Sequence, residues 1–299
     1  MIKRGELNTE QQNPSSEDIG NMDVSTILKI INKEDLQVIE AVKAVIPEIE
    51  TAVNYTIESV KNNGRVFYVG AGTSGRLGVL DASEIPPTFS AKKNLFIGII
   101  AGGDDALKSS IEGAEDDRHN AIIDLEPYQL NENDVLIGIS CSGAASYVIS
   151  ALDYARTKGT KTIYLVMNPT PYFNTDVDLI IKASTGSEII AGSTRMKAGS
   201  ATKMILNMIS TATMIKLGKV YKNLMIDLMA VNEKLIDRGT RIIANITGLD
   251  YRAAQKKLNE ANGSVKLAIV MHNKNCNHKQ ARKILKDSDG FLGPIIDDL

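Results

Sequence analysis

The stretch that decides the fold comprises residues 66–90, VFYVGAGTSGRLGVLDASEIPPTFS. Its apolar start, Val66–Val69, predicts a buried parallel strand, and a glycine-rich turn then leads into a helix. Such a connection directs free backbone N–H groups and side-chain hydroxyls at one point, which is an arrangement that binds phosphate. The residues expected to form this phosphate site are Gly72, Thr73, Ser74 and Gly75.

Strands alternate with helices along the middle of the chain. Four further apolar runs are typical of buried strands: Leu95–Ile100, Val135–Ile139, Thr162–Val166 and Leu179–Ile181. Helical patterns lie between them at Leu77–Glu84, Asp104–Ile111, Asp116–Ile123 and Ser146–Arg156. This alternation predicts an α/β fold with a doubly wound parallel sheet and right-handed crossovers.

Helical segments are expected both before and after the sheet region in the sequence. After an irregular start with a turn at Asn13–Ser16, residues 24–61 predict helices separated at Asn32–Asp35. No strand is expected after Ile190, only helices at Thr194–Leu217, Leu224–Thr247, Tyr251–Ala261, Ser264–His272 and His278–Lys286. We therefore expect N-terminal helices within residues 1–62, a sheet domain at 63–248 and a small helical C-terminal domain at 249–299.

Composition excludes several classes of partner. The 299 residues carry a net charge of −2, so a nucleic-acid partner is not expected. No apolar segment is long enough for a signal core or a membrane span, so we expect no membrane association and a cytoplasmic location. Two cysteines are too few for a disulfide framework. His272, Cys276 and His278 lie close in sequence but lack a fourth ligand, which argues against zinc.

The glycine turn also matches the pattern G-x-G-x-x-G, and this leaves two alternatives open. A dinucleotide site needs an acidic residue at the end of the second strand, but here that strand is followed by Ala101-Gly102-Gly103 and the first acid is Asp104. A purely structural tight turn is the other alternative. The hydroxyls of Thr73 and Ser74 favour a sugar-phosphate site over both.

A carboxylate, Glu84, is expected in the last turn of the helix after the glycine turn, because Pro86 and Pro87 should end that helix. The helix dipole disfavours a negative charge there, which suits a general acid, whereas a solvated surface glutamate is the alternative. At about 1.5 Å per residue, roughly 13 Å separate Glu84 from Gly75, too far for one hexose phosphate to touch both. Either this helix bends, or Glu84 serves a site whose phosphate loop comes from a neighbouring subunit. The second alternative is favoured, and it makes a homodimer part of the expectation.

Polar side chains follow other strands of the predicted sheet. The third strand is followed by a second serine-rich turn that contains Ser140, Ser142 and Gly143. A second carboxylate, Glu115, lies in an acidic run after the second strand, where it can face the same crevice. The alternative is that this run only decorates a helix N-terminus, where acidic residues are favourable.

A last polar run precedes the long helix expected from Thr194. It extends from Glu188 to Lys197, and Ser193 or Thr194 is expected to cap the helix. Arg195 and Lys197 carry charges that would neutralise an anion, and a solvated first turn is the alternative.

Several separated motifs closely resemble those of bacterial N-acetylmuramic acid 6-phosphate etherases, over essentially the whole chain. They are Thr9-Glu10 with Asn13, the run 70–78, Asp81–Glu84 with Pro86-Pro87-Thr88, Glu112–Asp116, Gly192–Gly199 and Asn232–Leu235. The resemblance implies a sugar isomerase (SIS) type fold that binds phosphosugars, a homodimer with shared active sites, and no metal or organic cofactor. It also implies removal of D-lactate from position 3 of the sugar, with Glu84 protonating the departing ether and Glu115 acting as the base at C2. The implied substrate-binding residues are Gly72, Thr73, Ser74, Gly75, Ser140, Ser142, Gly143, Glu188, Ser193, Thr194 and Lys197.

The chain departs from this family pattern after the third strand. Where these etherases usually read S-G-R-T-P, it has Ser142-Gly143-Ala144-Ala145-Ser146, so a threonine that usually contacts phosphate is lost. A non-catalytic phosphosugar sensor similar to the glucokinase regulatory protein is the alternative function, and an aldose–ketose isomerase is a third. Retention of Glu84 favours the lyase, because the sensor lacks that motif and an isomerase needs no acid at C3.

Overall fold

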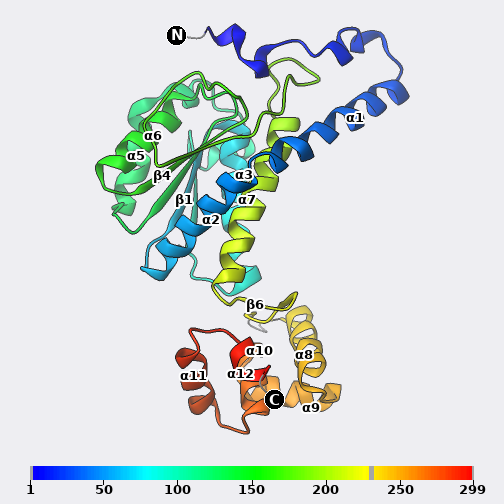
Figure 1. Cartoon of the computed structure of the whole chain (residues 1–299), viewed down its shortest axis with the longest axis vertical. Coiled ribbons are helices and arrows are strands. Elements are labelled where there is room, and N and C mark those ends of the chain that lie inside the picture. Colours follow the sequence, from blue (N-terminus) through cyan, green and yellow to red (C-terminus); the bar gives the residue numbers. More distant parts are fainter. Residues whose placement is uncertain (1–2, 229–231, 298–299) are drawn as a thin grey trace. The chain divides into compact units, whose positions relative to one another are not determined.

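The computed structural model describes residues 3–228 and 232–297, which fall into two compact units. The first, called here the sheet unit, comprises residues 1–83 and 94–210. The second, the C-terminal unit, comprises residues 84–93 and 211–299. Figure 1 shows the elements of both units in chain order.

A five-stranded parallel sheet lies at the centre of the sheet unit, with strand order β2-β1-β3-β4-β5 (Figure 1). Its strands are β1 (Val66–Gly70), β2 (Phe96–Ile100), β3 (Val135–Ile139), β4 (Lys161–Val166) and β5 (Leu179–Lys182). Every strand predicted from the sequence is present, and the parallel arrangement is confirmed. Gly70 pairs in register with both Ile100 and Ile139, so β1, β2 and β3 end at the same edge. The strand order reverses between β1 and β3, which is where open α/β sheets bind ligands.

Helices cover both faces of this sheet, as predicted for a doubly wound fold. The helices that belong wholly or partly to the sheet unit are α1 (Val24–Lys43), α2 (Ile46–Lys61), α3 (Gly72–Phe89), α4 (Asp105–Lys108), α5 (Arg118–Leu125), α6 (Ser146–Thr157) and α7 (Lys197–Lys216). Phe67 and Val69 pack into a buried cluster with α5 and α6. Tyr68 points to the other face, where its hydroxyl donates to Asp81 of α3 at 3.2 Å. In Figure 1, α5 and α6 lie on one side of the strands and α2 on the other.

Residues 3–22 form an N-terminal strap, in which short 3-10 turns are joined to distant parts of the sheet unit. The turn predicted at Asn13–Ser16 is confirmed, since the Asn13 side chain accepts the Ser15 N–H at 2.8 Å. Asn13 also donates to the Ser187 carbonyl at 3.0 Å, and the Ser16 hydroxyl donates to the Ile189 carbonyl at 2.8 Å. The strap is therefore fixed to the segment that precedes α7.

The predicted interruption of the first helix at Asn32–Asp35 is wrong, because α1 continues through these residues to Lys43. Glu34, which looked like part of a polar break, is buried and paired with a lysine far along the chain. The break occurs instead at Ala44 and Val45, just before Pro47. Proline is favourable in the first turn of α2 because its missing N–H would have no helical acceptor there.

The prediction that Pro86 and Pro87 end α3 is also wrong, because the helix continues to Phe89. The prolines remove only two backbone donors near the helix end, while the buried side chains of Ile85 and Phe89 hold the last turns. Glu84 consequently lies before the last turn. The influence of the helix dipole is confined to the last turn, so it no longer supports a neutral Glu84.

The short α4 ends at Lys108, whereas a helix to Ile111 was predicted. The Arg76 guanidinium binds the carbonyls of Leu107 and Ser109, at 3.2 and 3.0 Å, and holds the chain in a loop there. The next helix, α5, begins later than predicted because Asp117 caps it by accepting two backbone N–H groups.

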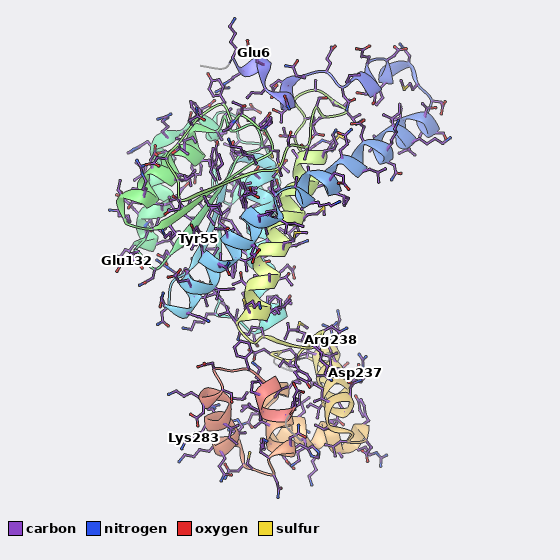
Figure 2. All side chains as sticks on the ribbon, in the orientation of Figure 1. Glu6, Tyr55, Glu132, Asp237, Arg238 and Lys283 are labelled. Carbon is purple, nitrogen blue, oxygen red and sulfur yellow. The ribbon has the colours of Figure 1, made fainter. Side chains whose placement is uncertain are left out.

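The C-terminal unit has its own apolar core, built from short amphipathic helices. Its helices after α7 are α8 (Glu233–Thr247), α9 (Tyr251–Glu260), α10 (Val265–Asn273), α11 (His278–Asp287) and α12 (Gly293–Ile296). The predicted helices at α9, α10 and α11 are confirmed, and the short α12 was not predicted. Asp237, labelled on α8 in Figure 2, forms an ion pair with Arg241 one turn later.

The helix predicted from Leu224 begins late, at Glu233, where the Asn232 side chain caps it. The segment before it contains a small antiparallel hairpin, β6 (Val220–Tyr221) and β7 (Leu224–Met225), which contradicts the expectation of no strand after Ile190. Lys222 adopts φ 53° in the connecting turn, a conformation that ends any helix. Residues 229–231 of the predicted helix lie outside the described residues. Across the described ranges, no helix combines the length and apolar character that a membrane span requires.

Candidate functional site

A pocket of about 130 Å³, called here the switch-point pocket, lies where the turns after β1 and β3 meet. The loop before α7 contributes Thr194 to it, and the 3-10 turn Ala114–Asp116 contributes Glu115. The structure thus brings these predicted site residues together: Gly72, Thr73, Ser74, Glu115, Ser140, Ser142 and Thr194. The predicted residues Gly75, Gly143, Glu188, Ser193 and Lys197 do not line this pocket.

The start of α3 supplies backbone donors to this pocket. The N–H groups of Gly72, Thr73 and Ser74 open the helix and have no helical acceptor. Gly72 begins the helix with φ 53°, which favours glycine. Gly75 has a packing role, because a Cβ on it would lie 2.6 Å from the Gly70 carbonyl oxygen. The positive end of the helix dipole and the free N–H groups together favour an anion.

The turn after β3 presents hydroxyls to the same pocket. The Ser142 hydroxyl oxygen accepts the Ala144 N–H at 3.2 Å, which leaves the Ser142 hydrogen to donate to a ligand. Gly143 shapes the turn with φ 73°, and a Cβ on it would lie 2.4 Å from the Pro171 side chain. Ala145 also lines the pocket. Hydroxyls and N–H groups therefore dominate a site that suits a phosphate group.

Helix α7 is capped by a carboxylate, and the prediction that Ser193 or Thr194 caps it is wrong. The buried Glu188 accepts the backbone N–H groups of Lys197 and Ala198 at 3.0 and 2.9 Å. A carboxylate has two acceptor oxygens, and here each oxygen accepts one of the two N–H groups. Burial raises the pKa of Glu188, and the two N–H groups only partly oppose this.

Lys197 faces the N-terminal part of the chain. Its ammonium group is buried and contacts Glu34 at 2.8 Å and the Gln37 amide oxygen at 3.0 Å. The Asn13 amide donates to the same Glu34 carboxylate at 2.7 Å. Burial acts to raise the pKa of Glu34, but hydrogen bonds from Lys197 and Asn13 hold it below its ordinary value. Lys197 thus joins the strap and α1 to the start of α7.

Thr9 of the strap connects two segments that line the switch-point pocket. Its carbonyl accepts the Gly192 N–H at 2.8 Å, close to Thr194. The Asn168 amide donates to the Thr9 hydroxyl at 3.2 Å and to the Cys141 carbonyl at 3.1 Å. Asn168 was not predicted as a site residue, because a lone asparagine after a strand carries no motif.

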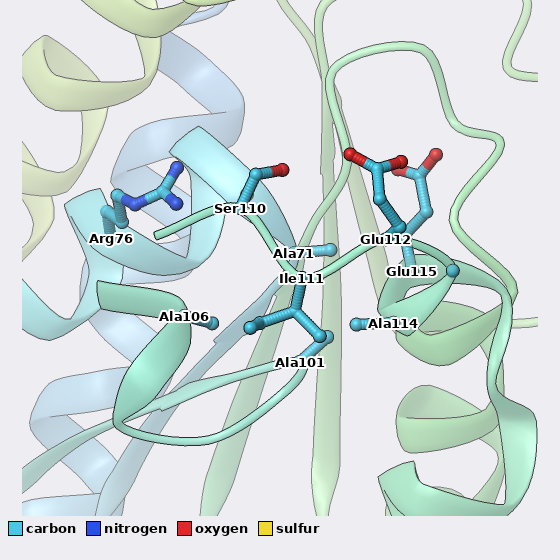
Figure 3. A pocket seen from close by; sticks show the side chains of 11 residues that line it. Ala71, Arg76, Ala101, Ala106, Ser110, Ile111, Glu112, Ala114 and Glu115 are labelled. Carbon is cyan, nitrogen blue, oxygen red and sulfur yellow. The ribbon is translucent and has the colours of Figure 1, made fainter. Parts of the chain in front are cut away.

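A second pocket of about 210 Å³, called here the Arg76 pocket, shares Ala71, Gly72 and Glu115 with the first (Figure 3). Arg76, Ser110, Ile111 and Glu112 also line it. In Figure 3 the Glu112 and Glu115 carboxylates reach into the pocket from one side, and Arg76 lies on the opposite side. Arg76 was not predicted as a site residue, although it lies within the motif at residues 70–78.

The predicted catalytic carboxylates belong to different units. Glu115 is exposed at the junction of the two pockets, and Glu84 is exposed on α3 in the C-terminal unit. In the part of the chain that the structure describes, no group of three or more His, Cys, Asp or Glu side chains is placed to hold a metal ion.

Comparison with known proteins finds relatives over nearly the whole chain. An N-acetylmuramic acid 6-phosphate etherase 1 from Bacillus licheniformis is 49% identical over 288 residues, covering 96% of this chain and 95% of that protein. An N-acetylmuramic acid 6-phosphate etherase from Oceanobacillus iheyensis is 49% identical over 286 residues, covering 96% and 97%. A family model for the glucokinase regulatory protein N-terminal SIS domain matches residues 48–156. The solved phosphoheptose isomerase of Francisella tularensis is 23% identical, with TM-score 0.48, and covers 64% of this chain and 100% of that chain.

Proposed function

This chain belongs to the N-acetylmuramic acid 6-phosphate etherase family, and from this we propose that it releases D-lactate from that sugar phosphate and leaves N-acetylglucosamine 6-phosphate. The reaction is a carbon–oxygen elimination followed by hydration. The match to the regulatory-protein domain covers residues 48–156 only, whereas the etherases match nearly the full length. A phosphosugar sensor is therefore the weaker alternative.

The observation that carries the proposal is the switch-point pocket, where phosphate-binding groups and Glu115 meet. We assign the 6-phosphate to this pocket. The N–H groups at the start of α3 and the hydroxyls of Thr73, Ser74, Ser142 and Thr194 act as donors to its oxygens. Among the residues that the structure describes, no positively charged side chain lines this pocket, so neutral donors and the helix dipole hold the phosphate.

We assign Glu115 as the general base. When the sugar ring opens, the proton on C2 lies next to an aldehyde and becomes acidic enough for a carboxylate to remove. The electron pair left on C2 then expels lactate from C3, which gives an unsaturated aldehyde. Water adds to C3 and a proton returns to C2, so the product carries a hydroxyl on C3 where the substrate carried the lactyl ether. Glu115 is exposed and lines the same pocket as the proposed phosphate donors, which supports this assignment.

We assign Glu84 as the acid that protonates the departing lactate oxygen. The helical spacing between Gly75 and Glu84 favours a homodimer in which each subunit supplies Glu84 to its partner's phosphosugar. The residue is exposed and available for such a contact. Both cysteines are free thiols, which suits the reducing cytoplasm where we place the reaction.

The decisive assay incubates the purified full chain with N-acetylmuramic acid 6-phosphate and measures D-lactate with a coupled dehydrogenase. We expect lactate release, and its absence together with phosphosugar binding would favour the sensor.

Glu84→Gln should abolish lactate release while leaving phosphosugar binding within a fewfold of wild type. Glu115→Gln should abolish exchange of the C2 proton in deuterated water, and retained exchange would refute its role as the base. Glu132→Gln, an exposed glutamate labelled in Figure 2 at the opposite edge of the sheet, is the matched control and should remain active.

A further inference from the structure

The Arg76 pocket contains a positive charge that phosphate binding and acid–base chemistry leave unused. Arg76 is half-buried, and its Nε and Nη2 groups donate to two loop carbonyls at 3.2 and 3.0 Å. Its Nη1 group donates to none of the described residues, and no described carboxylate lies within ion-pair distance of the guanidinium. The backbone contacts therefore fix the group in place while donors remain free for a ligand.

The other charges of the pocket locate where an anion would bind. Glu112 and Glu115 line the side opposite Arg76 and repel a negative group (Figure 3). An anionic ligand group is consequently favoured at the Arg76 end. Ile111 and Ala106 form an apolar part of the same lining, next to the Ser110 hydroxyl. A small group with one carboxylate and one methyl matches this combination of charge, hydroxyl and apolar surface.

The substrate of the proposed reaction has two anionic groups, a phosphate on C6 and a carboxylate on the lactyl ether at C3. Glu115 lines both pockets, so a substrate with its C2 proton at Glu115 has C3, the next carbon, at the boundary between them. With the phosphate in the switch-point pocket, the lactyl group extends into the Arg76 pocket. We propose that Arg76 binds the lactyl carboxylate and so determines specificity for a lactyl ether over an uncharged substituent. This assignment depends on the etherase activity proposed above.

The guanidinium is well suited to this task because its planar set of N–H donors matches a carboxylate. A hydrogen bond to a charged group contributes about 1.5–3 kcal/mol, which converts to roughly 10- to 150-fold in kcat/KM. A neutral amide in place of the carboxylate should lose most of this factor while keeping nearly the same size.

The test compares N-acetylmuramic acid 6-phosphate with its lactyl carboxamide, with products measured by mass spectrometry. Wild type should prefer the acid by roughly 10- to 150-fold in kcat/KM. Arg76→Gln should reduce this preference to nearly one, mainly by slowing the acid, and Arg76→Lys should retain part of it. An equal loss for both substrates in Arg76→Gln would show that Arg76 only holds the loop, and would overturn the proposal.

Two further outcomes are distinct from that one. If wild type cleaves the acid and the carboxamide equally well, the proposal fails even if Arg76→Gln does not fold. If wild type cleaves neither, the proposed etherase function itself fails. Lys108→Gln, on α4 beside the same loop, removes a positive charge outside the pocket lining and should keep the wild-type preference.

Discussion

Replacing Lys197 by methionine should destabilise the sheet unit by about 3 kcal/mol at pH 7. The Lys197 side chain is 1% exposed and that of Glu34 is 6% exposed, so the change leaves a buried carboxylate without its cation. Removing one partner of a buried ion pair costs about 3–5 kcal/mol. The low end applies here because Asn13 and Ser15 still donate hydrogen bonds to Glu34.

The loss of stability in Lys197→Met should depend on pH, because it depends on whether the buried Glu34 carboxyl is charged. In the wild-type chain burial acts to raise the Glu34 pKa, but hydrogen bonds from Lys197 and Asn13 keep it below the ordinary value of 4.5. The stabilisation is therefore complete above the unfolded-state pKa and is lost as the pH falls through the lower folded-state pKa. In Lys197→Met, burial is no longer opposed by a cation, so Glu34 takes up a proton more readily and acid relieves the penalty. The difference in stability between the two proteins should shrink from pH 7 to pH 4.

Urea denaturation of the full chain, followed by circular dichroism at pH 7, 5 and 4, measures this difference. The double variant Glu34→Gln/Lys197→Met removes both charges and should recover much of the stability at pH 7. Lys43→Met is the control, because its ion pair with Glu40 is exposed and long, at 3.5 Å. A loss below about 1 kcal/mol at pH 7, or a difference that does not change with pH, would refute the reasoning.

Ala145→Thr should lower KM for the phosphosugar severalfold, because it adds a hydroxyl to the lining of the switch-point pocket. Steady-state kinetics measures this, and an unchanged or higher KM would contradict the prediction. Gly143→Ala should abolish measurable phosphosugar binding in calorimetry, since its Cβ would meet Pro171 at 2.4 Å where φ is 73°, and a wild-type Kd would count against that role. Lys266→Met should destabilise the C-terminal unit by about 2 kcal/mol, because two carbonyls, each 2.9 Å from the ammonium group, lose their donor. Hydrogen–deuterium exchange should rise in that unit, and an unchanged exchange pattern would argue against it.

The strands could be predicted because the apolar residues that indicate each strand lie within the strand itself. Val66–Val69 and Val135–Ile139 are continuous apolar runs of strand length, typical of a sheet buried on both faces, and the structure has them almost unchanged. The meeting of Ser74 and Ser142 in one pocket was also predictable, because parallel strands end at the same edge. The parallel sheet topology alone therefore predicts most of the residues that line the switch-point pocket.

The errors occurred where a distant partner changes the local preference. Glu34 looked like part of a helix break, yet its ion pair with Lys197 spans 163 residues of sequence. Glu188 caps α7 in place of a nearby hydroxyl because the loop before the helix folds back on it. Asn168 and Arg76 could not be predicted as site residues for a related reason. Their hydrogen bonds depend on which backbone carbonyls the fold brings close to them.

The strap has a consequence for the order in which the molecule is built during translation. Its hydrogen bond from Ser16 reaches Ile189, a separation of 173 residues. At about 5–20 residues per second, the ribosome needs roughly 9 to 35 seconds to produce the acceptor after the donor. The strap, although synthesised before the sheet, is thus among the last segments to dock, and the loop that carries Thr194 gains its final support only then. A nascent chain released before residue 189 would leave the strap without its docking site and open to proteases.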